Sequence, residues 1–146
     1  MVAALLRQAL GQAVDGRRVE VASAGLCAYE IGKVGLGGDP AVVELLAAEG
    51  IDISAHRVTA LNPNMYGETD LVIAMEPWQR TVLRTSYRDE KCVTLHELTA
   101  GDSDAKVADT ALMAPTALRE TFLELRHSVA RAAAVILAAA RPAESA

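Results

Sequence analysis

The run Asp70–Met75 (DLVIAM) places the strongest constraint on what this chain can fold into. An uninterrupted apolar run of this length, followed at once by a proline-initiated segment, is typical of a short strand that is buried on both faces. Such strands occur where helices cover both sides of a parallel sheet. The run therefore predicts a sheet with a helical layer on each side.

The segments around this run alternate between helical and extended patterns. Asp39 and Pro40 provide an N-cap and a first-turn proline for one helix, and residues 31–38 (IGKVGLGG) read as a loop. Helices are predicted over residues 1–10, 40–49, 77–85 and 115–140, strands over 18–22, 70–75 and 91–95, and a loop over 99–116. This order predicts an α/β fold with three layers, a parallel sheet flanked by helices, in a single domain spanning residues 1–146.

Composition narrows the functional class. The chain has 146 residues, of which 51% are apolar, and a formal net charge of -5. No basic patch is evident, so we expect no nucleic-acid partner. No run approaches the roughly 18 apolar residues that would span a bilayer, so we expect no membrane partner. The absence of a secretory signal and the wide separation of Cys27 and Cys92 favour a reducing, cytoplasmic location.

An ordered set of short segments carries a family resemblance. The set comprises VEVASAG (19–25), Asp39–Val42, Gly50–Asp52, His56–Arg57, Asp70–Met75 and Arg119–Phe122. Together these segments resemble the low-molecular-weight protein-tyrosine phosphatases over essentially the whole chain. The resemblance implies a sheet of strand order 2-1-3-4. It also implies hydrolysis of phosphotyrosine proteins or small aryl phosphates through a cysteinyl-phosphate, with no metal and no cofactor.

The family's chemistry depends on a C-x5-R loop between its first strand and first helix. Backbone N–H groups of that loop bind the phosphate and lower the pKa of the cysteine, while the arginine binds two phosphate oxygens. The opening MVAALLRQAL is similar to the helix that follows this loop, and Cys27 is followed six residues later by Lys33 rather than Arg. Glu30 in that stretch would repel a phosphate. We therefore interpret Cys27 as a loop residue and Cys92 as a buried, inert thiol, and we expect the chain as given to lack the nucleophile and to be inactive.

The first strand of the family is also expected to be missing. In the order 2-1-3-4 this strand lies between the second and third strands. Without it, the backbone N–H and C=O groups of those two strands would be unpaired. Each such buried group would cost about 1–3 kcal/mol of stability. A chain that truly begins at Met1 should then fold poorly, rearrange its sheet or borrow a strand from a partner. An internal methionine that was taken for the initiator would explain the same sequence.

Four residues match positions around the family's phosphate site. The resemblance assigns Asp109 as the general acid, with Asp102 and Asp104 as competitors, and Tyr29 as an aromatic wall for the substrate ring. Ser23 and His56 match positions that hold the shape of the phosphate loop. The residues alone leave other interpretations open. Asp109 could belong to a solvated acidic loop, Tyr29 could be an ordinary exposed tyrosine, and His56 could be a helix-capping or core histidine.

Three functions remain as alternatives at this point. The first is a phosphatase whose first strand lies outside this sequence. The second is a non-catalytic pseudophosphatase that binds a partner, for example as a strand-complemented homodimer. The third is an arsenate reductase, which the wide gap between Cys27 and Cys92 disfavours, because that chemistry needs closely placed cysteines.

Overall fold

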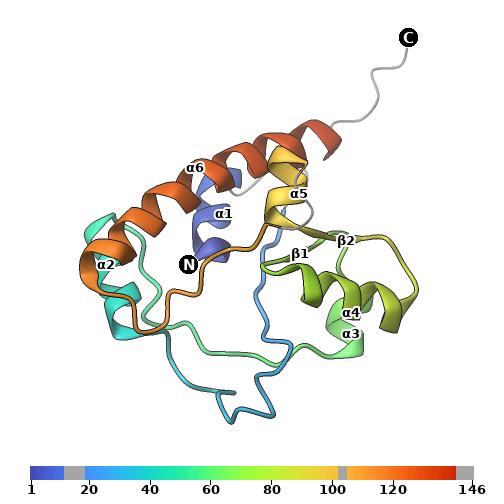
Figure 1. Cartoon of the computed structure of the whole chain (residues 1–146), viewed down its shortest axis with the longest axis horizontal. Coiled ribbons are helices and arrows are strands. Elements are labelled where there is room, and N and C mark those ends of the chain that lie inside the picture. Colours follow the sequence, from blue (N-terminus) through green and yellow to red (C-terminus); the bar gives the residue numbers. More distant parts are fainter. Residues whose placement is uncertain (12–18, 102–104, 141–146) are drawn as a thin grey trace.

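The computed structural model describes residues 1–11, 19–101 and 105–140 (Figure 1). Helices and strands alternate along much of the chain, as the sequence predicts. The elements are α1 (Val2–Leu10), α2 (Pro40–Ala48), α3 (Pro63–Gly67), β1 (Val72–Ala74), α4 (Pro77–Tyr87), β2 (Cys92–Thr94), α5 (Leu95–Ala100) and α6 (Pro115–Ala140).

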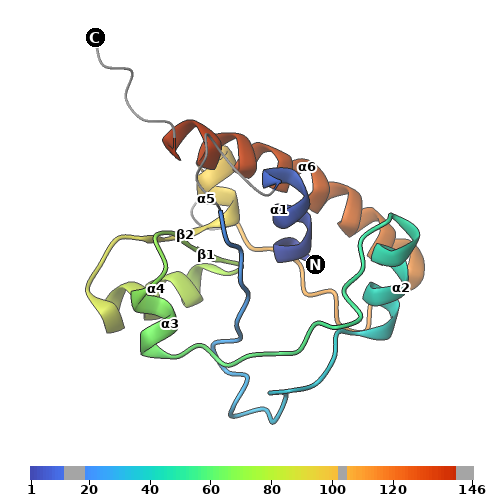
Figure 2. The same ribbon diagram turned by 180° about the vertical axis from the view of Figure 1, so that it is seen from behind.

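Strands β1 and β2 run parallel, with Val72 paired to Cys92 and Ala74 paired to Thr94. Successive side chains of a strand point to opposite faces. Val72 and Ala74 belong to an apolar cluster with Tyr66 of α3 and Leu83 of α4. The residue between them, Ile73, packs instead against the cluster formed by α1, α2, α5 and α6. The sheet therefore lies between two helical layers, and Figure 2 shows α3 and α4 on one side of it.

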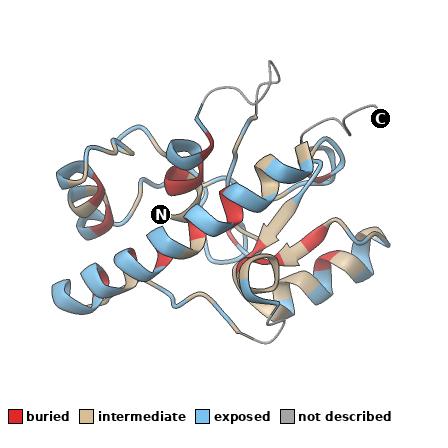
Figure 3. Ribbon diagram, turned by 90° about the horizontal axis from the view of Figure 1, so that it is seen from above, coloured by how far each residue is buried: buried red, intermediate tan, exposed pale blue. Residues whose placement is uncertain are grey.

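Helix α6 supplies the largest share of the core. Its buried residues follow helical spacing and are Leu118, Phe122, Leu125, Val129, Ala132 and Ala133. They pack against Ala4, Leu5, Leu6 and Leu10 of α1 and against Leu46 of α2. In Figure 3 the buried residues interrupt an otherwise exposed surface on this longest helix. The helix predicted over residues 115–140 is confirmed, and Ile136 near its end is only partly buried.

The strand predicted over 18–22 is wrong for the residues that can be checked. Val19–Ala22 form neither helix nor strand, while Arg18 lies outside the described residues. Regular strand structure needs a neighbouring backbone, and the carbonyl of Val21 accepts a hydrogen bond from Arg7 Nε of α1 at 2.8 Å instead. The alternating apolar pattern of this segment is therefore not sufficient to make it a strand.

Two short helices were not predicted. The 99–116 loop and the 91–95 strand are both corrected, because α5 begins at Leu95 and continues to Ala100. Thr94 accepts from the Glu97 backbone N–H, and the Glu97 side chain accepts from the Thr94 N–H, so a capping box starts this helix. Asn62 caps α3 in a similar way, through its side chain and Met65 N at 2.9 Å. The T-x-x-E spacing from Thr94 to Glu97 and the Asn62-Pro63 pair are the local sequence signals for these two helices.

Among the described residues, none of the helices combines the length and apolar character needed to cross a bilayer.

Candidate functional site

The carboxyl ends of the strands carry the segments that could form a site. Beyond β1, the side-chain Oε1 of Gln79 accepts from the backbone N–H groups of Met75 at 3.0 Å and Glu76 at 3.2 Å. This contact fixes the turn from β1 into α4. The Val107 N–H donates to the Met75 carbonyl at 2.8 Å, which ties the segment leading to Asp109 to the same edge. Ligands of open α/β sheets bind at this edge.

The segment 25–36 forms the opposite wall of the site. Gly25 pairs in parallel with Ala60 as an isolated bridge. Hydrogen-bonded turns follow over residues 26–32, with hydrogen bonds from Lys33 N to Ala28 O and from Gly32 N to Tyr29 O. Gly32 adopts φ 64°, a left-handed conformation that favours glycine. Val58 then exchanges two hydrogen bonds with Gly35 and Leu36. The wall is therefore held in place although it contains no regular strand.

A cavity of about 240 Å³ lies between this wall and the start of α4. Its apolar lining includes Leu26, Ile31, Val58 and Trp78, and its polar lining includes Lys33 and Gln79. Cys27 also borders the cavity and is exposed, whereas Cys92 is buried in β2. Burial raises the pKa of the Cys92 thiol, so this group is not poised for nucleophilic chemistry. Both interpretations of the cysteines made from the sequence agree with these positions.

The four residues assigned from the resemblance lie on three segments. Ser23 and Tyr29 are exposed on the 19–36 segment, and His56 is half-buried on the segment that pairs with it. Asp109 is exposed, and its Oδ1 accepts from Ala111 N at 2.9 Å. No hydrogen bond joins any two of these four side chains within the described parts of the chain. Asp102 and Asp104 lie outside the described residues.

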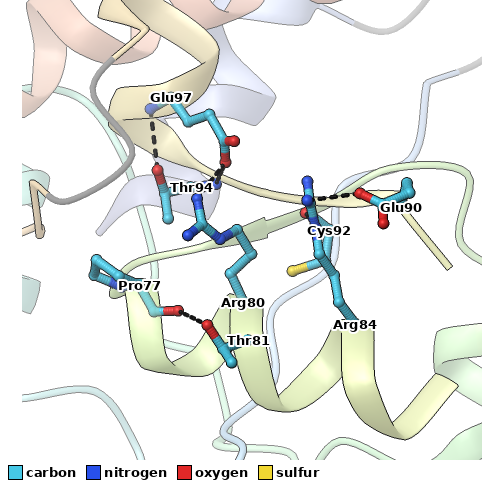
Figure 4. Close-up of polar contacts among 8 residues, drawn as sticks. All are labelled: Pro77, Arg80, Thr81, Arg84, Glu90, Cys92, Thr94 and Glu97. Atoms are coloured by element: carbon cyan, nitrogen blue, oxygen red, sulfur yellow. Dashed lines mark hydrogen bonds and ion pairs between the residues drawn. The ribbon is translucent and has the colours of Figure 1, made fainter. Parts of the chain in front are cut away.

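An ion-pair network stabilises the helix that borders the cavity (Figure 4). Arg80 Nη1 contacts Glu97 Oε2 at 3.0 Å, and Arg84 Nε donates to the Cys92 carbonyl at 2.7 Å. Burial raises the pKa of Glu97, but hydrogen bonds from Arg80 and from the Thr94 N–H outweigh this effect and hold it below its usual value. The network joins α4 to β2 and α5, and so it holds in place the helix whose first residues line the cavity.

No group of three or more His, Cys, Asp or Glu side chains is arranged to hold a metal ion in the described ranges. The sequence contains no cysteine followed six residues later by arginine. The groups available at the edge are therefore the exposed carboxylate of Asp109, the aromatic side chain of Tyr29 and an apolar cavity.

Comparison with known proteins decides the family. A model described as low molecular weight phosphotyrosine protein phosphatase matches residues 1–140. The chain belongs to this family. A probable low molecular weight protein-tyrosine-phosphatase EpsP from Ralstonia nicotianae is 36% identical over 87 residues, covering 60% of this chain and 53% of that protein. The match thus spans about half the length of that phosphatase.

Solved structures of the family agree with the fold. The solution structure of a low molecular weight protein tyrosine phosphatase from Bacillus subtilis has a TM-score of 0.80 and 26% identity, covering 96% of this chain and 89% of that one. A low molecular weight protein tyrosine phosphatase from T. tengcongensis has a TM-score of 0.72 and 27% identity, covering 89% and 85% of the two chains. The α/β fold with a parallel sheet that the sequence predicts is confirmed.

Sequence reasoning missed two residues of this edge, Trp78 and Gln79. Gln79 occupies the third position of a capping box that Glu76 begins, and this spacing could have identified it. Trp78 gave no local signal, because its role as a cavity wall depends on the distant 25–33 segment.

Proposed function

We propose that this chain provides the surroundings of a phosphatase site that hydrolyses phosphotyrosine or small aryl phosphates. In this proposal Asp109 protonates the leaving phenol oxygen, Tyr29 stacks on the substrate ring, and Ser23 and His56 support the phosphate loop. The observation that carries the proposal is the convergence of the 25–36, 75–79 and 105–109 segments at the carboxyl edge of the sheet.

The nucleophile is proposed to come from a strand and C-x5-R loop that the given sequence does not contain. Val72 N donates to Lys91 O, and neighbouring residues of a strand direct their backbone groups to opposite sides. The N–H and C=O of Ile73 therefore point away from β2, and no strand pairs with that side of β1 among the described residues. A parallel strand on this unpaired side of β1 would end at the sheet edge where the segment leading to Asp109 lies. The C-x5-R loop that follows such a strand would then lie at the same edge.

The proposal also explains why Arg7 contacts Val21. Val19, Val21 and Ile73 all pack against the core cluster that contains the buried residues of α1. The Arg7 guanidinium satisfies a carbonyl of that segment at 2.8 Å. An inserted strand would pair with carbonyls and N–H groups of the segment instead, because sheet hydrogen bonds are the usual partners of such groups.

Asp109 can be tested through the leaving group of the substrate. In a chain extended in frame upstream to include a C-x5-R loop, Asp109→Asn should lower kcat for phenyl phosphate by about 10²-fold or more. The loss for p-nitrophenyl phosphate should be smaller, because its leaving group departs without a proton. Asp70→Asn, at another exposed aspartate, is the matched control and should change neither rate.

Two outcomes would count against the proposal. Equal losses on both substrates would remove Asp109 from the general-acid role. An extended chain with an intact C-x5-R loop but no turnover would favour the pseudophosphatase alternative, in which the same edge binds a partner without catalysis.

A further inference from the structure

One peptide group connects the start of α4 to the segment that carries Asp109. The peptide between Met75 and Glu76 contains the Met75 carbonyl and the Glu76 N–H. Gln79 Oε1 accepts from this N–H at 3.2 Å, and Val107 N donates to this carbonyl at 2.8 Å. The peptide is trans and planar, so its N–H and C=O point in opposite directions, and a bond that fixes one also fixes the direction of the other. Gln79 and Val107 are therefore coupled through a single rigid unit.

The side chain of Gln79 is held in the orientation that this contact needs. Its Oε1 also accepts from Met75 N at 3.0 Å, so it bonds two consecutive backbone N–H groups at the end of β1. The Glu76 side chain in turn accepts from the Gln79 backbone N–H, which completes a capping box. Gln79 is half-buried, and hydrogen bonds are electrostatically stronger away from water. The contact can therefore resist movement of the turn.

Helix α4 provides a fixed base for Gln79. Arg80 Nη1 contacts Glu97 Oε2 at 3.0 Å, and Arg84 Nε donates to the Cys92 carbonyl at 2.7 Å (Figure 4). These contacts tie the helix to α5 and β2 without using the Gln79 side chain. Loss of the Gln79 carbonyl should therefore loosen the turn that precedes α4 and leave the helix itself in place.

Apolar packing alone does not fix where Asp109 lies. The Val107 side chain packs against the large cluster formed by α1, α2, α5 and α6, but such packing is non-directional. A hydrogen bond has a preferred length and direction, so the bond from Val107 to Met75 sets the position of this segment along the sheet edge. Asp109 follows two residues later. A displacement of Val107 along the edge should therefore move Asp109 with it.

We propose that Gln79 is a positioning residue for Asp109, acting through the Met75–Glu76 peptide and Val107. The inference rests on the proposed function, because Gln79 affects the reaction only where Asp109 is the general acid. A general acid must lie within hydrogen-bond reach of the atom that it protonates. A misplacement of about 1 Å can cost about 10²-fold in rate, so an indirect contact of this kind can matter to catalysis.

Amide exchange in residues 1–146 tests the coupling without catalysis. Gln79→Met removes the acceptor and keeps a side chain of similar length. Gln79→Glu keeps an acceptor, and either Glu or Gln can complete a capping box at this position. In NMR exchange measurements, the Val107 N–H should exchange about tenfold faster in Gln79→Met, the factor expected for the net loss of one hydrogen bond. Gln79→Glu should restore a rate close to the original.

The Val72 N–H provides an internal reference for this experiment. It donates to the Lys91 carbonyl at 3.0 Å, toward β2, and should keep its exchange rate in Gln79→Met. Leu83→Val is the matched control on α4, because Leu83 is buried in the cluster on the other side of the sheet from Val107. This control should accelerate both amides alike. An unchanged Val107 rate in Gln79→Met, or equal acceleration of Val72 and Val107, would overturn the inference.

Kinetics of the upstream-extended chain test the role in catalysis. Gln79→Met should lower kcat for phenyl phosphate by about tenfold or more and kcat for p-nitrophenyl phosphate by less, with KM nearly unchanged for both. Gln79→Glu should restore most of the lost rate. The double variant Gln79→Met/Asp109→Asn should lose little more than Asp109→Asn alone, because residues that act as one unit have non-additive effects. Additive losses in the double variant would overturn the inference.

The inference and the proposed function can fail separately. If the loss in Asp109→Asn depends on the leaving group and the loss in Gln79→Met does not, Gln79 is not a positioning residue and the phosphatase proposal stands. If the loss in Asp109→Asn does not depend on the leaving group, the general-acid role is contradicted, and the catalytic role of Gln79 is overturned with it. Faster exchange of Val107 in Gln79→Met would then still support the coupling between the two segments.

Discussion

At the residue scale, the clearest chemistry lies in groups that the fold has paired or buried. Glu97 accepts hydrogen bonds from Arg80 at 3.0 Å and from the Thr94 N–H at 3.2 Å. Cys92 lies inside β2, and Cys27 lies open on the 27–33 turn. These contrasts give two predictions that do not depend on catalysis.

Glu97→Gln should destabilise the protein at neutral pH by about 1–2 kcal/mol, because hydrogen bonds to a charged, partly screened carboxylate are lost. The pKa of Glu97 is lowered in the folded state, so its contribution is complete above its unfolded pKa and is lost as pH falls through the folded pKa. Urea unfolding of both proteins from pH 7 to pH 3 should therefore show a gap that closes on the acid side. A difference in unfolding free energy that stays constant with pH would contradict this account. The control is Glu90→Gln, which changes an 83% exposed ion-pair partner of Arg84 and should have a smaller effect.

Alkylation should distinguish the two thiols. In the folded protein, iodoacetamide should modify Cys27 and spare Cys92, because burial both shields that thiol and raises its pKa. Mass spectrometry should find one added group per chain before denaturation and two after it. Modification of Cys27→Ser protein without denaturant would show that β2 is more open than the structure indicates.

At the element scale, α6 holds the large cluster together. Phe122→Ala should lower the free energy of unfolding by about 3–5 kcal/mol, since the ring is 1% exposed and leaves a cavity when removed. Leu123→Ala changes the next residue, which is 42% exposed, and should cost under about 1 kcal/mol. Urea unfolding measures both values. Similar losses in the two variants would mean that the stripe on α6 is misplaced.

The elements also show how far sequence reasoning reaches. The helix over residues 115–140 and the Asp39 cap depend on local sequence and were predicted. The Asp39 side chain accepts a hydrogen bond from Ala41 N at 2.9 Å. The segment Val19–Ala22 has equally good local spacing but forms no strand, because strand structure depends on a neighbour that sequence pattern does not reveal. Helix α5 was not predicted, although the Thr94 and Glu97 pair that forms its capping box is a local signal in the sequence.

The candidate site was predictable only in part for the same reason. Ser23, Tyr29, His56 and Asp109 came from family resemblance, and their proposed roles remain to be tested. The cavity could be found only from the fold, because Ile31 and Trp78, which both line it, are far apart in sequence. Local pattern could identify each segment but not their meeting.

At the scale of the whole molecule, one relation links fold and function. Two helical layers enclose a parallel sheet, and the segments that end at its carboxyl edge hold the proposed general acid, the aromatic wall and the apolar pocket. The family match over residues 1–140 places this arrangement among low-molecular-weight phosphatases. We propose that residues 1–146 hold the surroundings of a phosphate site and that its nucleophile lies outside them.

Vanadate-sensitive hydrolysis of p-nitrophenyl phosphate by residues 1–146 tests this claim most directly. The account predicts no turnover above the buffer rate from this chain, and turnover once an in-frame upstream segment with a C-x5-R loop is added. In the extended chain, Cys27→Ser should leave this turnover unchanged, because the exposed thiol is not expected to take part in it. Vanadate-sensitive turnover by residues 1–146 would contradict the claim, because the nucleophile would then lie within the chain.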